Sequence, residues 1–255
     1  MPRPPILEYP GAGPAVIEPV RRAGTYGPVP ECAVLCYFAD ELDRMHRAGQ
    51  LRQVFTTGVE DELPVYRMGR GKNAVALCFP GIGAPRTAMT LEVLIGCGAR
   101  RIVCCGSAGA LVPGLEAGTI VVPDAALRDE GTSYHYQVRG RFSRPHAAAL
   151  RAIKEACRER GAPFIVGKTW TTDGLFRETP RQVQRRRDEG CLVVEMEAAA
   201  LFAVARFREV ILGQLLYAGD DVSQETWNTR NWSQLTGPRQ ALLHLAIDSV
   251  RRIAG

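Results

Sequence analysis

Residues 191–205 constrain the fold most, because a short apolar segment runs directly into a longer segment rich in alanine and leucine. Residues 191–194 are apolar and end in two valines, which is typical of a buried strand. The residues after position 197 have a strong helix preference. The stretch therefore predicts a buried strand that passes at once into a helix.

Two carboxylates, Glu195 and Glu197, stand at this junction with Met196 between them. One acid is explained by the partial positive charge at a helix N-terminus. Two acids beside a buried strand are explained less well, because an ionised carboxylate is costly to bury without a partner. In α/β sheets, ligands gather where strands end and helices begin. We therefore interpret the junction as part of a ligand site, with a helix-start role as the alternative.

The rest of the chain alternates between short apolar segments and segments of helical character. Strands are predicted at residues 33–38, 54–57, 64–67, 74–79, 101–105, 119–122, 164–170 and 210–217. Helices are predicted at residues 39–48, 87–96, 145–160, 180–189 and 235–253. Other predictions are a hairpin turn at 70–73, a possible continuation of the sheet at 125–128 and a polar loop at 129–136. This order predicts one α/β domain with a central mixed, largely parallel twisted sheet flanked by helices.

The length of 255 residues fits one large domain. We expect a proline-rich N-terminal arm over residues 1–30, with a short edge strand at 15–18 stopped by Pro19, and an α/β domain over residues 31–255. No apolar run reaches the roughly 20 residues of a membrane helix. The first residues lack the apolar core of a secretory signal. We therefore expect no membrane partner and a cytoplasmic location.

Cysteine and charge exclude other classes of function. The eight cysteines lie mostly in apolar surroundings, without a Cys-x-x-Cys pair, and the four histidines are scattered. This pattern indicates buried thiols in a reducing compartment and argues against a zinc site. The net charge of +5 comes mostly from arginine, as in residues 185–187. We interpret that triplet as the solvated face of a polar helix, so no nucleic-acid partner is expected.

Two glycine-rich segments follow predicted strands. Residues 80–87 follow the strand at 74–79, and residues 106–110 follow the strand at 101–105. We interpret both as turns whose backbone N–H groups could face an anion, while a plain tight turn explains the first equally well. Arg86 occupies the third glycine position of a dinucleotide-binding Gly-x-Gly-x-x-Gly, and no Walker loop is present. Neither NAD nor ATP is therefore favoured.

The strand ends form an ordered set of motifs. They are Gly-x-Gly at 81–83, Gly-Ser-x-Gly at 106–109, Thr-Asp at 172–173, Glu-Met-Glu at 195–197 and an Asp pair at 220–221. In this order the chain resembles the nucleoside phosphorylase family, which includes purine nucleoside phosphorylases, uridine phosphorylases and the related nucleosidases. The resemblance extends from about residue 80 to residue 217, and residues 194–200 are its most specific part.

The resemblance implies roles for particular residues. Met196 and Glu197 match the residues that hold the ribose, and Glu195 would border the same pocket. The implied phosphate-binding residues are Gly83, Arg86, Gly106 and Ser107. The implied base-binding residues are Gly109, Leu175, Phe176 and Arg177. Catalysis would rest on Glu197 and on Asp220 or Asp221, of which Asp221 aligns better with the acid that protonates a purine.

The implied reaction is the phosphorolytic cleavage of a uridine- or purine-type nucleoside to the free base and a (deoxy)ribose 1-phosphate. Inorganic phosphate would be the co-substrate, with no cofactor, and the family implies a homo-oligomer, either a dimer or a hexamer. Two departures keep alternatives open. Cys104 stands where these phosphorylases usually carry a phosphate-binding arginine, and their N-terminal Pro-Gly-Asp-Pro-x-Arg motif is missing. Either Arg86 substitutes, or water attacks and the enzyme is a hydrolytic nucleosidase, or the chain is a non-catalytic nucleoside-binding module.

Overall fold

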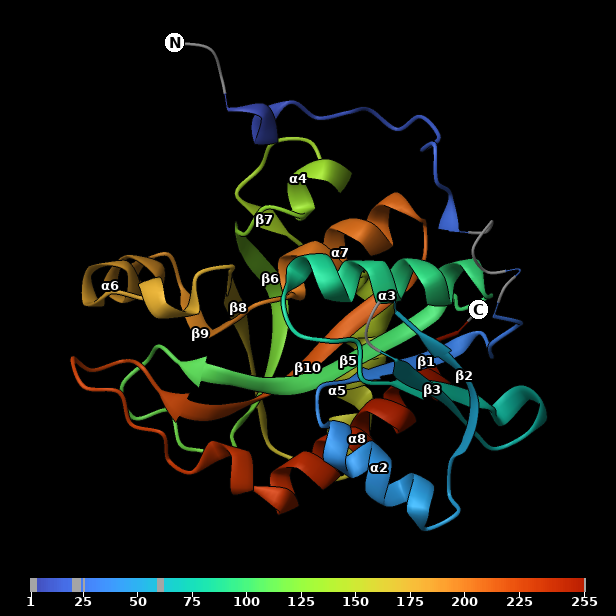
Figure 1. Cartoon of the computed structure of the whole chain (residues 1–255). Coiled ribbons are helices and arrows are strands. Elements are labelled where there is room, and N and C mark those ends of the chain that lie inside the picture. Colours follow the sequence, from blue (N-terminus) through green and yellow to red (C-terminus); the bar gives the residue numbers. More distant parts are fainter. Residues whose placement is uncertain (1–3, 20–23, 25, 59–61, 255) are drawn as a thin grey trace.

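The computed structural model describes residues 4–19, 24, 26–58 and 62–254. Within them, ten strands form one mixed sheet with helices on both faces (Figure 1). The strands are β1 (Cys32–Cys36), β2 (Arg52–Thr57), β3 (Leu63–Met68), β4 (Val75–Cys78), β5 (Arg101–Ala110), β6 (Ile120–Asp129), β7 (Phe142–Ser143), β8 (Phe164–Thr172), β9 (Cys191–Glu195) and β10 (Ile211–Asp221). The predicted α/β class with a central mixed sheet is confirmed.

Helices cover the sheet in two layers (Figure 1). They are α2 (Ala39–Arg47), α3 (Ala84–Gly96), α4 (Ser133–Tyr136), α5 (Ala147–Glu159), α6 (Pro180–Asp188), α7 (Ala198–Phe207) and α8 (Thr236–Arg252). The chain also forms the 3₁₀ turns η1 (Pro5–Leu7), η2 (Gly71–Asn73), η3 (Leu175–Arg177) and η4 (Trp232–Gln234). None of the helices in the described ranges has the length and apolar character that crossing a bilayer would require.

The central strands are buried on both faces, and this explains their continuous apolar sequence. Along β1, Ala33 and Leu35 join the core formed with α3 and α7. The alternate residues Val34 and Cys36 join the core formed with α2, α5 and α8. All eight cysteines are buried and unpaired, and they serve as small apolar residues in these two cores and at β9.

Strand β5 is central in the sheet, and its pairing brings the predicted motifs to one edge. It pairs in parallel with β1 and β10, and β1 pairs in parallel with β4. The last residues of β5 also pair with β9, where Gly109 lies opposite Val194. The ends of β4, β5, β9 and β10 therefore lie near one another, which is the arrangement expected of a ligand site in an α/β sheet.

The prediction of a turn at residues 106–110 is wrong, because β5 continues through them to Ala110. Pairing with β10 persists there, with Ala108 opposite Ala218. The small residues serve close packing. A Cβ atom on Gly106 would lie 3.0 Å from the ring of Tyr37, and one on Gly109 would lie 3.1 Å from Val194. Glycine is used here for space and not for a turn.

Three other predictions differ from the structure. The predicted edge strand at 15–18 is wrong, since Val16 and Ile17 pair with no strand in the described structure and are exposed. The predicted polar loop at 129–136 contains α4, while the continuation of the sheet at 125–128 is confirmed within β6. Helix α3 begins at Ala84, before the predicted residue 87, with Pro85 in its first turn. Residues 1–3, 20–23 and 25 of the predicted arm lie outside the described residues.

Candidate functional site

Glu195 ties the end of β9 to the first turn of α7. Its Oε1 accepts hydrogen bonds from the Thr171 hydroxyl at 2.6 Å and from the Thr169 hydroxyl at 3.2 Å. Its Oε2 accepts from the backbone N–H groups of Glu197 at 2.8 Å and Ala198 at 2.6 Å. Burial raises the pKa of this carboxyl, and these four hydrogen bonds oppose the rise. Because both of its oxygens already accept two hydrogen bonds each, Glu195 serves to hold the end of β9 against the start of α7.

Glu197 is the carboxylate at this junction that can still accept hydrogen bonds from a ligand. Its Oε1 accepts from the N–H of Gly83 at 2.6 Å, and its Oε2 accepts from the N–H of Met196 at 3.3 Å. The side chain is 6% exposed. Burial, followed by repulsion from Glu195, raises the pKa of Glu197 to about 8. The structure thus brings Gly83 and Glu197 together, with the carboxylate engaging the amide that the sequence assigned to phosphate.

The glycine-rich turn after β4 is held by contacts between its own residues. Gly81 and Gly83 have φ values of +86° and +89°, which favour glycine. The Thr87 hydroxyl donates to the carbonyl oxygen of Gly81 at 3.1 Å. The side chain of Arg86 lies over Gly81, where an added Cβ would approach its Cγ to 2.3 Å. The turn therefore holds Gly83 in place for Glu197.

Tyr37 spans the space between this turn and β5. Its ring lies against Gly106, its backbone N–H donates to Cys105 O at 3.0 Å, and its hydroxyl donates to the Thr87 hydroxyl at 3.2 Å. Burial raises the pKa of Tyr37 well above its usual range, and the negative charge of Glu197 adds to the rise. Cys104, on the same face of β5, is fully buried among apolar side chains. Sequence reasoning missed Tyr37, because an aromatic residue at a strand end resembles ordinary core.

Ser107 lies on the opposite face of β5 from Gly106, as neighbouring strand residues do. It is paired in register with Tyr217, whose hydroxyl donates to Trp232 O at 3.0 Å. Burial raises the pKa of the Tyr217 hydroxyl, while the charge of Arg239 and a hydrogen bond with Ser107 oppose the rise. The structure therefore engages Ser107 with Tyr217, while Gly106 on the other face of β5 faces Tyr37.

The two aspartates at the end of β10 have different surroundings. Asp221 is 8% exposed, forms an ion pair with Arg230 and accepts from the N–H of Ser223 at 2.8 Å. Asp220 accepts from Trp227 Nε1 at 2.7 Å, and its Oδ1 lies 3.5 Å from where a Cβ of Gly109 would stand. The structure brings Asp220 and Gly109 together and places Asp221 in a separate ion pair.

Glu178 is a further acid beside Asp220 that sequence reasoning missed. Burial, and then repulsion from Asp220, raises the pKa of Glu178 to about 7. It follows the predicted base-binding residues of η3, which are exposed. Leu175 is 52% and Phe176 is 94% exposed, while Arg177 packs beside Gly174. The only signal in the sequence was the position of Glu178 directly after these residues.

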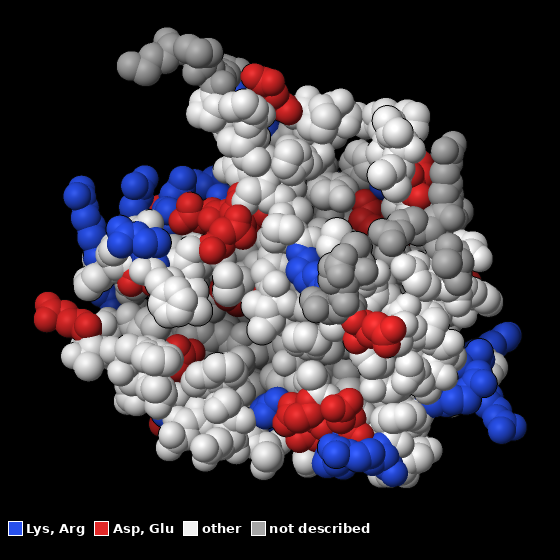
Figure 2. Space-filling model, in the orientation of Figure 1, with Lys and Arg blue, Asp and Glu red and all other residues white. Residues whose placement is uncertain are grey.

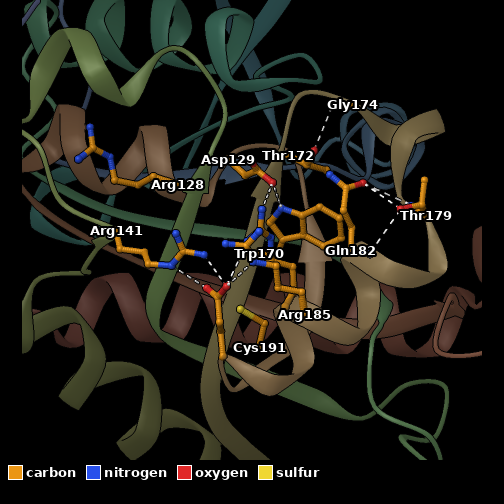
Figure 3. Close-up of polar contacts among 12 residues, drawn as sticks. Arg128, Asp129, Arg141, Trp170, Thr172, Gly174, Thr179, Gln182, Arg185 and Cys191 are labelled. Carbon is orange, nitrogen blue, oxygen red and sulfur yellow. Dashed lines mark hydrogen bonds and ion pairs between the residues drawn. The ribbon is translucent and has the colours of Figure 1, made fainter. Parts of the chain in front are cut away.

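A partly buried ion-pair network links α6 to the ends of β6 and β8 (Figure 3). Asp129 Oδ2 accepts from Trp170 Nε1 at 2.9 Å and from Arg186 at 2.7 Å. Arg186 also pairs with Glu189, and its guanidinium lies over the Trp170 ring. The interpretation of residues 185–187 as a solvated face is therefore wrong for Arg186, which is 8% exposed. Figure 2 shows several basic side chains at the surface in the region of α6.

Among the described residues, no group of three or more histidine, cysteine, aspartate or glutamate side chains is placed to hold a metal ion. The titratable groups of the site are carboxyls and Tyr37. Glu197 can accept hydrogen bonds from a polyol, and Glu178 beside Asp220 can supply a proton.

Comparison with known proteins assigns the chain to a family. A family model described as the phosphorylase superfamily matches residues 31–240. Guanosine phosphorylase of Halorubrum lacusprofundi is 32% identical over 141 residues, which cover 55% of this chain and 58% of that protein. Uridine phosphorylase of Thermococcus kodakarensis is 34% identical over 159 residues, which cover 55% and 56%. The chain thus spans little more than half the length of these two relatives.

Solved structures share the fold. Purine nucleoside phosphorylase of Toxoplasma gondii, in complex with immucillin-H, superposes with a TM-score of 0.76 at 19% identity, covering 94% of this chain and 98% of that one. AMP nucleosidase of Bacteroides thetaiotaomicron superposes with a TM-score of 0.70 at 23% identity, covering 87% of each chain. At these identities the likeness concerns the fold alone.

Proposed function

The chain belongs to the phosphorylase superfamily, and from this premise we propose that it is an enzyme that cleaves the N-glycosidic bond of a nucleoside and releases the free base. The observation that carries the proposal is Glu197, a buried carboxylate held by the amides of Gly83 and Met196 where the strand ends meet. Such a group suits a substrate that offers adjacent hydroxyls, as a ribose does.

Glu197 would act on the sugar. The C1′–N bond of a nucleoside breaks through an oxocarbenium-like state, in which positive charge develops on the ring. An ionised carboxylate that accepts hydrogen bonds from the sugar hydroxyls stabilises that charge more than it stabilises the ground state. Glu195 would hold the backbone of Glu197 through its N–H, and so position the acceptor.

Asp220 is the better candidate to protonate the leaving base. The second carboxyl, Asp221, is already engaged by Arg230 and Ser223. Asp220 lies beside Gly109 and near Glu178. The pKa of Glu178 is about 7, so Glu178 would hold the proton at neutral pH and Asp220 would pass it to the base. An acid with a pKa near the working pH is suited to proton transfer. This choice differs from the sequence alignment, which favoured Asp221.

The proposal leaves open which base the substrate carries and whether phosphate or water is the acceptor. The two curated relatives are named for guanosine and for uridine, so both purine and pyrimidine nucleosides are candidate substrates. Their names also support phosphate as the acceptor, while the name of the Bacteroides thetaiotaomicron neighbour supports water. The homo-oligomer, the cytoplasmic location and the absence of a cofactor stay predictions.

The test is base release from uridine, guanosine and AMP, each with and without phosphate, by the purified chain and by Glu197→Gln. We expect the variant to lose at least ~100-fold in kcat/KM, a loss similar to that of one preorganised transition-state contact. Binding of the nucleoside should persist, as measured by calorimetry. Glu155→Gln, an exposed acid on α5, is the matched control.

Two outcomes would count against this proposal. Binding without any turnover by the unmodified chain would favour the nucleoside-binding module. Full turnover by Glu197→Gln would remove Glu197 from the mechanism.

A further inference from the structure

Each of the four residues that the sequence assigned to phosphate contacts another part of the protein in the structure. The N–H of Gly83 donates to Glu197, and Gly106 is covered by the ring of Tyr37. The side chain of Arg86 lies over Gly81. Ser107 contacts Tyr217 on the other face of the sheet. A phosphate ion beside the sugar would have to displace several of these contacts at once.

Tyr37 fills the central part of this space. Its ring is held from both ends, by Gly106 of β5 and by the hydroxyl of Thr87, which in turn donates to Gly81. Thr87 is fully buried, so this bridge lies within the protein. An aromatic ring that is packed at one end and hydrogen-bonded at the other occupies the space that a tetrahedral anion at the same position would need.

The charges around Tyr37 also disfavour an anion. The ionisable groups that act on its hydroxyl are Glu197, Cys104 and Glu195. Burial holds the pKa of the Cys104 thiol well above its usual range, so near neutral pH only the two carboxyls can carry negative charge. A phosphate dianion near these carboxylates would be repelled by roughly 1–4 kcal/mol for each charge pair at about 4 Å. A neutral water molecule meets no such repulsion.

From these contacts we infer that Tyr37 closes the position of the phosphate, and that the acceptor in the reaction of this chain is water. The inference rests on the proposed function. In the reaction, a water oxygen bonds to C1′ as the C1′–N bond breaks. The bonding electron pair leaves with the base nitrogen, which takes up one proton. One nucleoside and one water give one free base and one free sugar.

Arg239 is the cation that could supply a rival phosphate site. Its charge acts on Tyr217, the residue that contacts Ser107. Its guanidinium is bound by Asp40 and donates to Ser233 O at 2.8 Å, and it lies over the ring of Phe38. Asp40 balances its charge, while its buried Nε has no hydrogen-bond partner among the described residues. A variant at this position therefore separates the two possibilities.

The experiment measures base release by the unmodified chain in phosphate-free buffer and with added phosphate, and identifies the sugar product. We expect rates that agree within about twofold, and a free reducing sugar with no sugar 1-phosphate among the products. A requirement for phosphate with formation of sugar 1-phosphate would overturn the inference and leave the proposed function intact. Loss of the phosphate-dependent base release in Arg239→Gln would then identify the rival site. No base release under either condition would instead defeat the proposed function.

Variants at Tyr37 test the residue itself. Tyr37→Phe keeps the ring and should remain indifferent to phosphate. Tyr37→Gly opens the space beside Gly106, so millimolar phosphate should change its rate of base release, either as acceptor or as inhibitor. A folded Tyr37→Gly, checked by circular dichroism, that ignores phosphate as the unmodified chain does would show that Tyr37 is not the barrier. The sugar product of the unmodified chain, either free sugar or sugar 1-phosphate, decides the acceptor even if this variant does not fold.

Discussion

At the scale of single residues, Glu195 and Glu197 show how two identical side chains acquire different roles. Glu195 accepts four hydrogen bonds, two of them from threonine hydroxyls on β8. Glu197 accepts two backbone hydrogen bonds. Its carboxylate keeps acceptor capacity that a sugar hydroxyl can use. The difference arises from the partners that the fold supplies, since both side chains are almost fully buried.

The raised pKa of Glu197 predicts the direction of the pH dependence. The proposed role needs the ionised carboxylate, and the pKa of about 8 means that this group is largely protonated at pH 6. The proton on Glu178, whose pKa is about 7, is lost over the same range. We therefore expect kcat/KM, which reports the free enzyme, to rise from pH 6 to a maximum at pH ~7.5 and to fall above pH ~8. Steady-state assays from pH 6 to 9 check the prediction. A profile that is flat or falls from pH 6 to 7 contradicts it.

At the scale of elements, the site depends on the contact between β8 and the start of α7. The Thr171 hydroxyl donates to Glu195 and accepts from the N–H of Ala199 at 3.0 Å. It therefore anchors the helix that begins beside Glu197. Substitution by valine keeps the shape of the side chain and removes both hydrogen bonds.

Thr171→Val should lower the free energy of unfolding by about 1–3 kcal/mol, because a buried acceptor and a helix N–H lose their partner. It should also lower kcat/KM, since Glu197 loses its support. Thr172→Val is the matched control, because its hydroxyl accepts from Gly174 and does not contact Glu195. Denaturant melts and kinetics of the two variants measure the difference. Equal effects on kcat/KM would remove the special role of Thr171.

The sequence predicted most elements correctly and failed where distant contacts decide. Apolar runs such as residues 210–217 predict buried strands because both faces of this sheet are covered. The meeting of Gly83 with Glu197 was also predictable, since both follow strands of one sheet. The extension of β5 through Gly106 was not, because pairing with β10 overrides the weak strand preference of small residues. The burial of Arg186 depends likewise on a distant partner, Asp129.

At the scale of the whole molecule, the N-terminal arm encloses a cavity against the body. The cavity has a volume of about 560 Å³ and lies between residues 10–19 of the arm and the helices α3, α4 and α7. Figure 1 shows the arm crossing above these helices. Arg208 forms ion pairs with Glu18 of the arm at 3.0 Å and with Glu92 of α3 at 2.8 Å. It therefore links the arm to the body through charge.

Arg208→Gln should loosen the arm, because both carboxylates lose a charged partner that they share. We expect limited proteolysis to cut within residues 10–19 several times faster than in the unmodified chain. Arg206→Gln, an exposed arginine on the same helix, is the control and should leave the cutting rate unchanged. Equal rates for both variants would show that other contacts hold the arm.

The ring of Tyr37 has a consequence for the direction of the reaction. Phosphorolysis conserves the activation of the sugar in its 1-phosphate, so such an enzyme can also assemble nucleosides from their parts. Transfer to water yields an unactivated sugar, and the large excess of water makes the return negligible. With its ring against Gly106, this one side chain would turn a reversible exchange into a one-way disposal of nucleosides.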